Sequence, residues 1–279
     1  MNLLLAADLG RLFRLEAIRR SALGLLIAAT FLPVAGVLVV GLGVLTARLA
    51  MMHVALVGIA VGLWTGLDPT VLGLVACAAV AVGMAPLADR PGGLSGPMGL
   101  VMTLAMAVAL LVLSISGVNA NGAFSLLWGS VFATRWPDVL LLAVLAVVVL
   151  GWMARAHRDV ALVLFDREIA ACSGVHVRLV TVVALVLVAL SIGASVRLTG
   201  ALLVDALTIL PALTARALAT SLRSMVLLAI TAGVVGNGAG FLLALELDQP
   251  LGPVLVLVSG LLTLVTYIKK GITHAPTPH

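Results

Sequence analysis

Two ionisable side chains stand inside long apolar stretches of the sequence. His53 lies within LTARLAMMHVALVGIAVG, and Asp205 lies within GALLVDALTILPA. The neutral imidazole nitrogen is a good ligand for divalent transition metals, so a proton and a metal ion would compete for His53. One histidine does not make a site, because a metal ion needs several ligands. The neighbouring thioethers of Met51 and Met52 suit copper(I), and we expect them to be lipid or core contacts instead.

The composition indicates that both residues lie in a membrane. Hydrophobic residues make up 63% of the 279, charged residues make up 10%, and the mean hydropathy is +1.28. A helix needs roughly 20 mainly apolar residues to cross a bilayer, where no water satisfies an unfolded backbone. We therefore expect an all-α, polytopic membrane protein with about eight or nine transmembrane helices. The expected spans are 21–46, 49–66, 70–87, 97–117, 139–153, 179–194, 199–215, 225–245 and 251–268.

A carboxylate near the centre of a membrane helix costs about 2.5–3.5 kcal/mol on insertion scales. Asp205 should therefore face a partner, a cavity or an oligomer axis. One interpretation is that it forms a hydrogen bond with Thr208, Thr199 or Asn237 and has no contact with a solute. For His53, the same energetic argument makes a place on a solute pathway the default hypothesis.

The formal net charge of +5 does not indicate a nucleic-acid partner, because the basic residues lie at the ends of the expected spans. With loop 155–178 in the cytoplasm, Arg135 and Arg197 face outward, and ten basic residues face inward. These ten are Arg48, Arg90, Arg155, Arg158, Arg167, Arg178, Arg216, Arg223, Lys269 and Lys270. The excess predicts this orientation in the cytoplasmic membrane. Four arginines among residues 1–20 disagree, and an amphipathic surface helix there would remove the conflict.

The domain boundaries follow from these spans. We expect an N-terminal amphipathic segment at 1–20, one transmembrane domain at 21–268 and a short tail at 269–279. The polar, glycine-rich piece 116–130 is either a loop or a re-entrant element. Cys77 and Cys172 fall in a span and in a polar loop, so no disulfide is expected. Glycines at intervals of four residues (Gly58, Gly62 and Gly66; Gly236 and Gly240) predict close helix packing, and Pro33 and Pro211 predict kinks.

The largest expected cytoplasmic piece is RAHRDVALVLFDREIAACSGVHVR, residues 155–178. Its centre predicts a short helix with Asp166 as N-cap or first-turn acid, Glu168 in the first turn and Gly174 at the C-terminal stop. A charged, capped helix that follows Phe165 between two spans is suited to docking a cytoplasmic partner. The alternative is an ordinary connecting loop.

The segment FDREIAACSGVHVR resembles the cytoplasmic coupling segment of permease subunits of ATP-binding-cassette importers for zinc, manganese and iron. Residues 17–62 look like the first two spans of that family, with His53 and Gly58 at the places of its histidine and following glycine. LTGALLVDALTILPALTARALATSLRSM is similar to the family's span that ends in a Pro-Ala-x-Thr-Ala stretch. LDQPLGPVLVLVSGLL is similar to its last hairpin. Together these matches cover roughly residues 17–268.

The resemblance implies a permease dimer around a central pathway, with a separate cytoplasmic ATP-binding subunit at the coupling segment. Phe165, Asp166, Glu168 and Gly174 would make that contact. A separate extracytoplasmic solute-binding protein or lipoprotein would deliver the metal. The chain has no Gly-x-x-x-x-Gly-Lys-Ser/Thr loop, and its lysines are Lys269 and Lys270, so we expect a transport subunit with no ATPase activity or cofactor of its own.

The sequence departs from the family pattern four residues before His53. The family usually has an aspartate there, and this chain has Leu49. His53 and its copy in a dimer supply only two ligands. The second interpretation of Asp205 is therefore that it replaces the lost ligand and lines the metal pathway together with His53.

Two other classes of function stay open at this point. A proton-coupled secondary carrier would use Asp205 and His53 as a protonation relay and would need no ATPase. A membrane anchor of another complex would transport nothing, and Leu49 is the residue that favours it. The coupling-like loop counts against the carrier, and no inverted repeat is visible.

Overall fold

The computed structural model describes residues 15–89, 94–116 and 134–273. Within these ranges the chain is helical and contains no strand. The helices are α2 (Glu16–Gly41), α3 (Leu45–Thr65), α4 (Pro69–Met84), the 3-10 helix η1 (Ala85–Asp89), α5 (Ser95–Ile115), α7 (Trp136–Phe165), α8 (Arg167–Cys172), α9 (Val177–Thr199), α10 (Ala201–Leu218), α11 (Leu222–Glu246) and α12 (Leu251–Thr273).

Eight segments of the described chain are long and apolar enough to cross a membrane. They contain α2, α3, α4 with η1, α5, α7, α9, α11 and α12. The remaining expected span, 199–215, corresponds to α10, which is shorter and carries buried Leu203, Val204 and Leu207. The expected all-α, multi-pass membrane fold is confirmed. The piece 116–130 lies outside the described residues except for Ser116, as do residues 1–14 of the expected N-terminal segment.

The first helix begins five residues earlier than the apolar pattern predicts. Glu16 opens α2 and forms an ion pair with Arg20 one turn later, with 3.9 Å between Oε1 and Nε. The indole nitrogen of Trp136 also donates a hydrogen bond to Glu16 Oε1, at 3.0 Å. Charged residues therefore extend the first membrane helix, and they join the beginnings of α2 and α7 at one end of the bundle.

Local signals set the turn between α3 and α4. Gly66 has a φ of +76°, which is the left-handed conformation that commonly ends a helix. Asp68 Oδ1 then accepts hydrogen bonds from the backbone nitrogens of Thr70 (2.7 Å) and Val71 (3.4 Å), and Pro69 occupies the first turn of α4. The predicted break at this point is confirmed, because the two helices form a tight hairpin.

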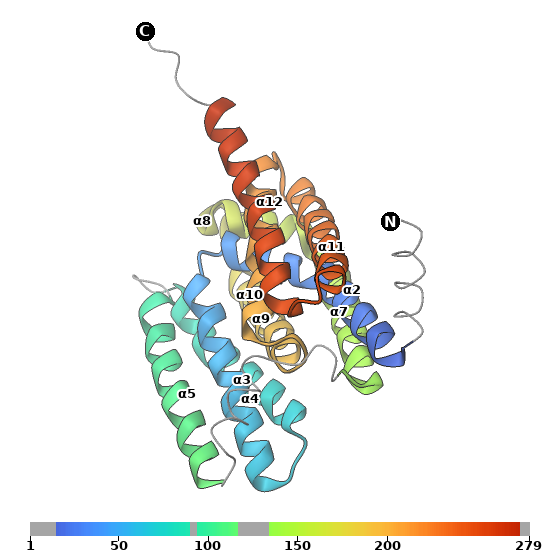
Figure 1. The fold of residues 1–279 in the computed structure, drawn as a ribbon. Coiled ribbons are helices and arrows are strands. Elements are labelled where there is room, and N and C mark those ends of the chain that lie inside the picture. Colours follow the sequence, from blue (N-terminus) through green and yellow to red (C-terminus); the bar gives the residue numbers. More distant parts are fainter. Residues whose placement is uncertain (1–14, 90–93, 117–133, 274–279) are drawn as a thin grey trace, which may run out of the picture.

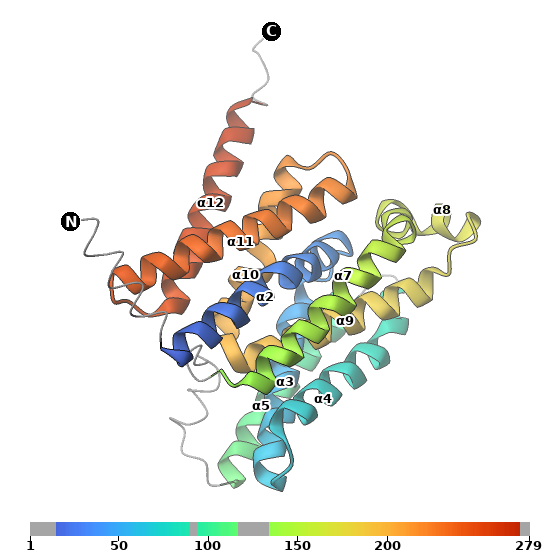
Figure 2. The ribbon, with the colours of Figure 1, turned by 90° about the vertical axis from the view of Figure 1, so that its right-hand side faces the viewer.

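The helices form two packing groups. In the first, α3 packs on α4 and α5; in the second, α2, α10, α11 and α12 pack on one another. Helix α9 contacts members of both groups, and α7 lies along α2 and α9. Figure 1 shows α3, α4 and α5 at the lower left and α2, α7 and α11 on the right, and Figure 2 shows the same division from the side.

Small residues bring the helix backbones close together. A Cβ atom on Gly58 or Gly62 would collide with the backbone of α4, and a Cβ atom on Gly240 would lie 3.0 Å from Leu255 of α12. The packing predicted from the glycine spacing is therefore confirmed at these positions. Pro33 lies inside α2, and its Cγ would lie 2.6 Å from a Cβ atom on Gly233 of α11.

Gly36 places α2 directly against α10. A Cβ atom at this position would overlap the carbonyl oxygen of Thr208 and lie 3.0 Å from Ala212. Thr208 is fully buried, so the backbone that carries this oxygen has no free space into which it could move. The register of α10, and with it the position of Asp205 one turn earlier, depends on this contact.

We expect Gly36→Ala to lower the free energy of unfolding by about 1–3 kcal/mol, because it overpacks a backbone-to-backbone contact. The matched control is Gly83→Ala in α4, where a new Cβ atom would meet nothing within 4 Å. The control should leave stability unchanged or raise it by up to about 1 kcal/mol, because alanine favours a helix. Thermal unfolding of both variants in one detergent measures the difference. Equal shifts would contradict the proposed role of this contact.

Candidate functional site

An ion pair between Arg48 and Asp205 joins the two packing groups. The guanidinium Nη1 of Arg48, in the first turn of α3, contacts Oδ1 of Asp205 in α10. The Arg48 side chain is 11% exposed and that of Asp205 is 35% exposed. Helices α3 and α10 otherwise share little packing. The pair therefore neutralises both interior charges and links two helices that apolar contacts alone hardly connect.

The structure adds burial and a partner to the sequence interpretation of Arg48. The charge pattern placed this residue with the basic residues at the cytoplasmic ends of the spans. In the structure α3 begins at Leu45, so Arg48 is part of the helix, and it is buried. Its neighbours in the sequence could not reveal this, because the partner lies 157 residues later in the chain.

The hydrogen-bond partners expected for Asp205 are bound elsewhere. The hydroxyl of Thr208 donates to the carbonyl oxygen of Val204 at 2.5 Å, and Nδ2 of Asn237 donates to that of Gly233 at 2.5 Å. The Thr199 side chain lies outside the described part of the structure. The energetic cost of the charge predicted that Asp205 needs a partner. The partner is Arg48 and not one of the expected polar side chains.

His53 is half-buried, and its ring is held by its own helix. Nδ1 lies 2.8 Å from the carbonyl oxygen of Leu49, one turn earlier. A carbonyl oxygen only accepts hydrogen bonds, so Nδ1 carries a proton. In the neutral ring the lone pair is then on Nε2, which is the atom available to a metal ion. The side chain of Leu49 provides no ligand of its own.

The described residues of a single chain do not assemble a complete metal site. No group of three or more histidine, cysteine, aspartate or glutamate side chains lies close enough to hold an ion. Asp205 is engaged by Arg48, and His53 by the Leu49 carbonyl. The structure thus places the two candidate residues on α3 and α10, with no hydrogen bond between them.

The short helix expected after Phe165 is present as α8. Asp166 caps it, because Oδ1 accepts hydrogen bonds from the backbone nitrogens of Glu168 (2.8 Å) and Ile169 (2.9 Å). Gly174 has a φ of +81°, just beyond the helix end. The predicted cap, first-turn acid and glycine stop are all confirmed. Figure 2 shows α8 projecting from the bundle between α7 and α9.

One exposed side chain and one hydrogen bond determine which surfaces α8 and its neighbours present. Phe165 is 81% exposed at the end of α7, so it presents a large apolar side chain beside the helix. Arg167 Nη1 donates a hydrogen bond to the carbonyl oxygen of Ala88 in η1, at 3.0 Å. A force on α8 would therefore reach η1, which follows α4 of the first packing group.

The sequence matches the ABC 3 transport family over residues 14–270. The chain belongs to this family. The resemblance inferred from the coupling segment, the His53 region and the last helices is thereby confirmed for nearly the whole ABC 3 chain.

Among curated relatives, the zinc uptake membrane protein ZnuB of Haemophilus influenzae is 23% identical over 219 residues, covering 78% of this chain and 84% of ZnuB. The manganese import permease ScaB of Streptococcus pneumoniae is 29% identical over 165 residues, covering 58% and 59% of the two chains. A solved structure, PsaBC from Streptococcus pneumoniae in complex with Fab, has the same fold, with a TM-score of 0.81, 20% identity and coverage of 94% and 95%.

The ABC 3 chain should lose stability when one charge of the ion pair is removed. We expect Arg48→Met to lower the free energy of unfolding by about 1–3 kcal/mol, because Asp205 would keep a half-buried charge without its partner. In the double variant Arg48→Met/Asp205→Leu, most of this loss should disappear, because neither charge remains. Thermal unfolding in detergent of Arg48→Met, of Asp205→Leu and of the double variant gives the three values.

The matched control is Arg155→Met, which removes an exposed arginine from α7 and should change stability little. Additive effects of the two single substitutions in the double variant would show that the ion pair carries no coupling energy.

Proposed function

We propose that the chain is the transport subunit of an ATP-driven importer that moves a divalent transition metal ion across the cytoplasmic membrane. The family match over residues 14–270 carries this proposal. The names of relatives narrow the solute, since ZnuB belongs to a zinc uptake system and ScaB to a manganese import system. A permease domain at 21–268, between an N-terminal surface segment and a short tail, fits the proposed function.

His53 and Asp205 are the proposed metal-pathway residues. The tautomer of His53 leaves Nε2 available, and nitrogen with carboxylate oxygen suits zinc, manganese and iron. Because Leu49 supplies no ligand, a second copy of the chain would have to contribute a further imidazole. The proposed homodimer around a central pathway meets this need.

In the proposed pathway, Arg48 competes with the metal ion for the carboxylate of Asp205. Its guanidinium occupies the carboxylate of Asp205, so an incoming cation has to displace it. The Nε atom of Arg48 is buried without a hydrogen-bond partner among the described residues, so the pairing does not satisfy the whole guanidinium. A partly satisfied pair is easier to exchange than a fully hydrogen-bonded one.

Helix α8 is the proposed docking element for a separate cytoplasmic ATP-binding subunit. Phe165 offers an exposed apolar anchor, and the Asp166 cap holds the helix in place beside it. Glu168 and Gly174 complete the proposed coupling segment. An extracytoplasmic binding protein or lipoprotein is the proposed source of the metal ion.

The transport proposal predicts that His53→Ala lowers ATP-dependent uptake of zinc or manganese at least about tenfold, because one imidazole ligand is lost from each chain. Asp205→Asn should do the same. The measurement is uptake of the radioactive ion into vesicles that contain the chain, its ATP-binding subunit and its binding protein. His274→Ala is the matched control, because His274 belongs to the short tail at 269–279, outside both the proposed pathway and the coupling segment, and it should transport normally.

Leu49→Asp restores a carboxylate one turn before His53, and it should partly rescue Asp205→Asn. Normal uptake by a His53→Ala/Asp205→Asn double variant would refute the proposed pathway. Uptake driven by a proton gradient without ATP would instead identify a secondary carrier.

The docking proposal predicts that Phe165→Ala weakens binding of the ATP-binding subunit about tenfold or more, because a buried aromatic anchor often dominates an interface. Co-purification and stimulated ATPase activity both measure the effect. Leu67→Ala is the control, since Leu67 is also exposed and apolar but lies in the turn between α3 and α4. An unchanged affinity for the Phe165→Ala variant would exclude this docking site.

A further inference from the structure

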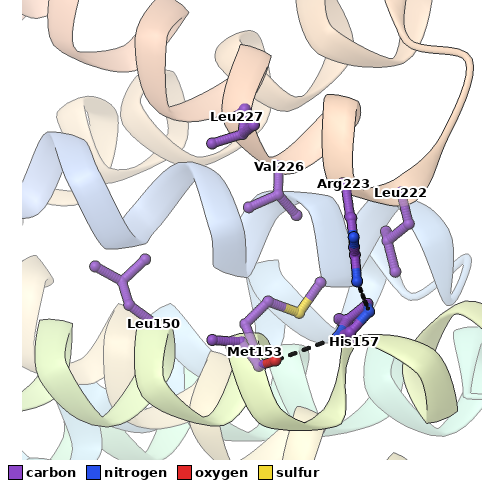
Figure 3. A pocket seen from close by; sticks show the side chains of 8 residues that line it. Leu150, Met153, His157, Leu222, Arg223, Val226 and Leu227 are labelled. Atoms are coloured by element: carbon purple, nitrogen blue, oxygen red, sulfur yellow. Dashed lines mark hydrogen bonds between the residues drawn. The ribbon is translucent and has the colours of Figure 1, made fainter.

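A groove of about 330 Å³ runs between α7 and α11, away from the proposed pathway. Leu150 and Met153 of α7 form one wall, and Val226 and Leu227 of α11 form the other. Leu227 is 64% exposed, so the groove opens to the surroundings of the bundle. Figure 3 shows these four apolar side chains along the groove.

One end of the groove is basic. Arg223 Nη2 lies 2.6 Å from Nε2 of His157, and Nδ1 of His157 lies 3.2 Å from the carbonyl oxygen of Ala154. Arg223 can only donate, and the carbonyl can only accept, so the imidazole is protonated on Nδ1 and accepts from the guanidinium. Figure 3 shows this contact at the end of the groove opposite Leu150.

The guanidinium keeps hydrogen-bond donors for an external ligand. Arg223 is exposed, and none of the carboxylates in the described part of the chain forms an ion pair with it. His157 uses one donor and fixes the orientation of the group. The basic end is therefore suited to an oxyanion such as a phosphate.

The basic end of the groove lies at the depth expected for lipid head groups. The apolar part of α7 ends at Met153, Arg155 and Arg158 follow as exposed residues, and α11 begins at Leu222. The basic end thus lies where membrane spans meet the cytoplasmic surface.

The apolar path continues along α11 toward the middle of the bilayer. Leu227, Val234 and Phe241 follow one another at intervals of seven residues, so they lie on one face of the helix. Val234 and Phe241 line a second groove of about 220 Å³ between α2 and α11. The eleven helical steps from Arg223 to Val234 rise about 16 Å, close to the thickness of one leaflet in a hydrocarbon core of about 30 Å.

We propose that the groove between α7 and α11 binds an anionic phospholipid of the cytoplasmic leaflet. Its phosphate contacts Arg223, which His157 orients, and one acyl chain covers Leu150, Met153 and Leu227. A basic pocket between transmembrane helices on this side of a membrane is suited to anionic head groups.

Native mass spectrometry of the purified chain, with phosphatidylglycerol or phosphatidylcholine added in equal amounts, tests the proposal. We expect one phosphatidylglycerol per chain to be retained at least about fivefold more strongly than phosphatidylcholine. Arg223→Gln should remove this preference. Arg155→Gln is the matched control, because Arg155 is exposed on α7 but does not line the groove, and it should keep the preference.

Two further measurements separate the possible ligands. Ala154→Leu should narrow the groove and reduce lipid retention without removing a charge. Excess inorganic phosphate should not displace the bound lipid, because it has no acyl chain. Equal retention of the two lipids by the unmodified chain would overturn the proposal, as would equal loss in the Arg223→Gln and Arg155→Gln variants. Displacement by inorganic phosphate would show a simple anion site instead.

Discussion

The charge of Asp205 is the constraint on which the arrangement of the interior depends. A carboxylate in an apolar interior is stable only if a partner neutralises it, and that partner is Arg48. Because the two residues come from α3 and α10, one interaction spans the boundary between the two packing groups. Apolar contacts hold each group together, and this polar contact adds to the packing of α9 on members of both groups.

Helix α2 positions α10 so that Asp205 can contact Arg48. It packs on α7, α10 and α11, and most of its side chains are buried. The absence of a side chain at Gly36 lets α10 approach it, and Pro33 lies against Gly233 of α11. Asp205 is therefore presented by a helix whose register is fixed by backbone contacts. In the proposed pathway, a carboxylate held in this way would exchange Arg48 for a metal ion without a rearrangement of its own helix.

Helix α8 and its neighbours connect the same two packing groups through a second set of contacts. Helix α8 is capped by its own residues, and Arg167 joins it to the end of η1. Helix α9, which follows α8, contacts members of both groups. A displacement of α8 could thus change the relation between the groups, and the Arg48–Asp205 pair is one contact that would respond. This gives a physical route between the proposed docking element and the proposed pathway.

The local sequence determined those helices and helix ends that depend on residues within a few positions of one another. The length and composition of the apolar runs predicted the membrane helices, and Asp166, Glu168 and Gly174 predicted the bounds of α8, because caps and stops act within one turn. The glycine spacing predicted close helix packing without naming the partners, and the structure shows close contacts of α3 with α4 and of α11 with α12, which are neighbours in sequence.

Only the tertiary structure identified the partner of Asp205. The sequence showed that the charge needed neutralising, but energetic need does not identify which of many polar side chains comes close. Arg48 lies at the beginning of a span, as the charge pattern predicted, but its neighbours in the sequence gave no sign of α10. The groove between α7 and α11 was hidden for the same reason, since Arg223 and His157 are separated by 66 residues and meet only when the helices pack.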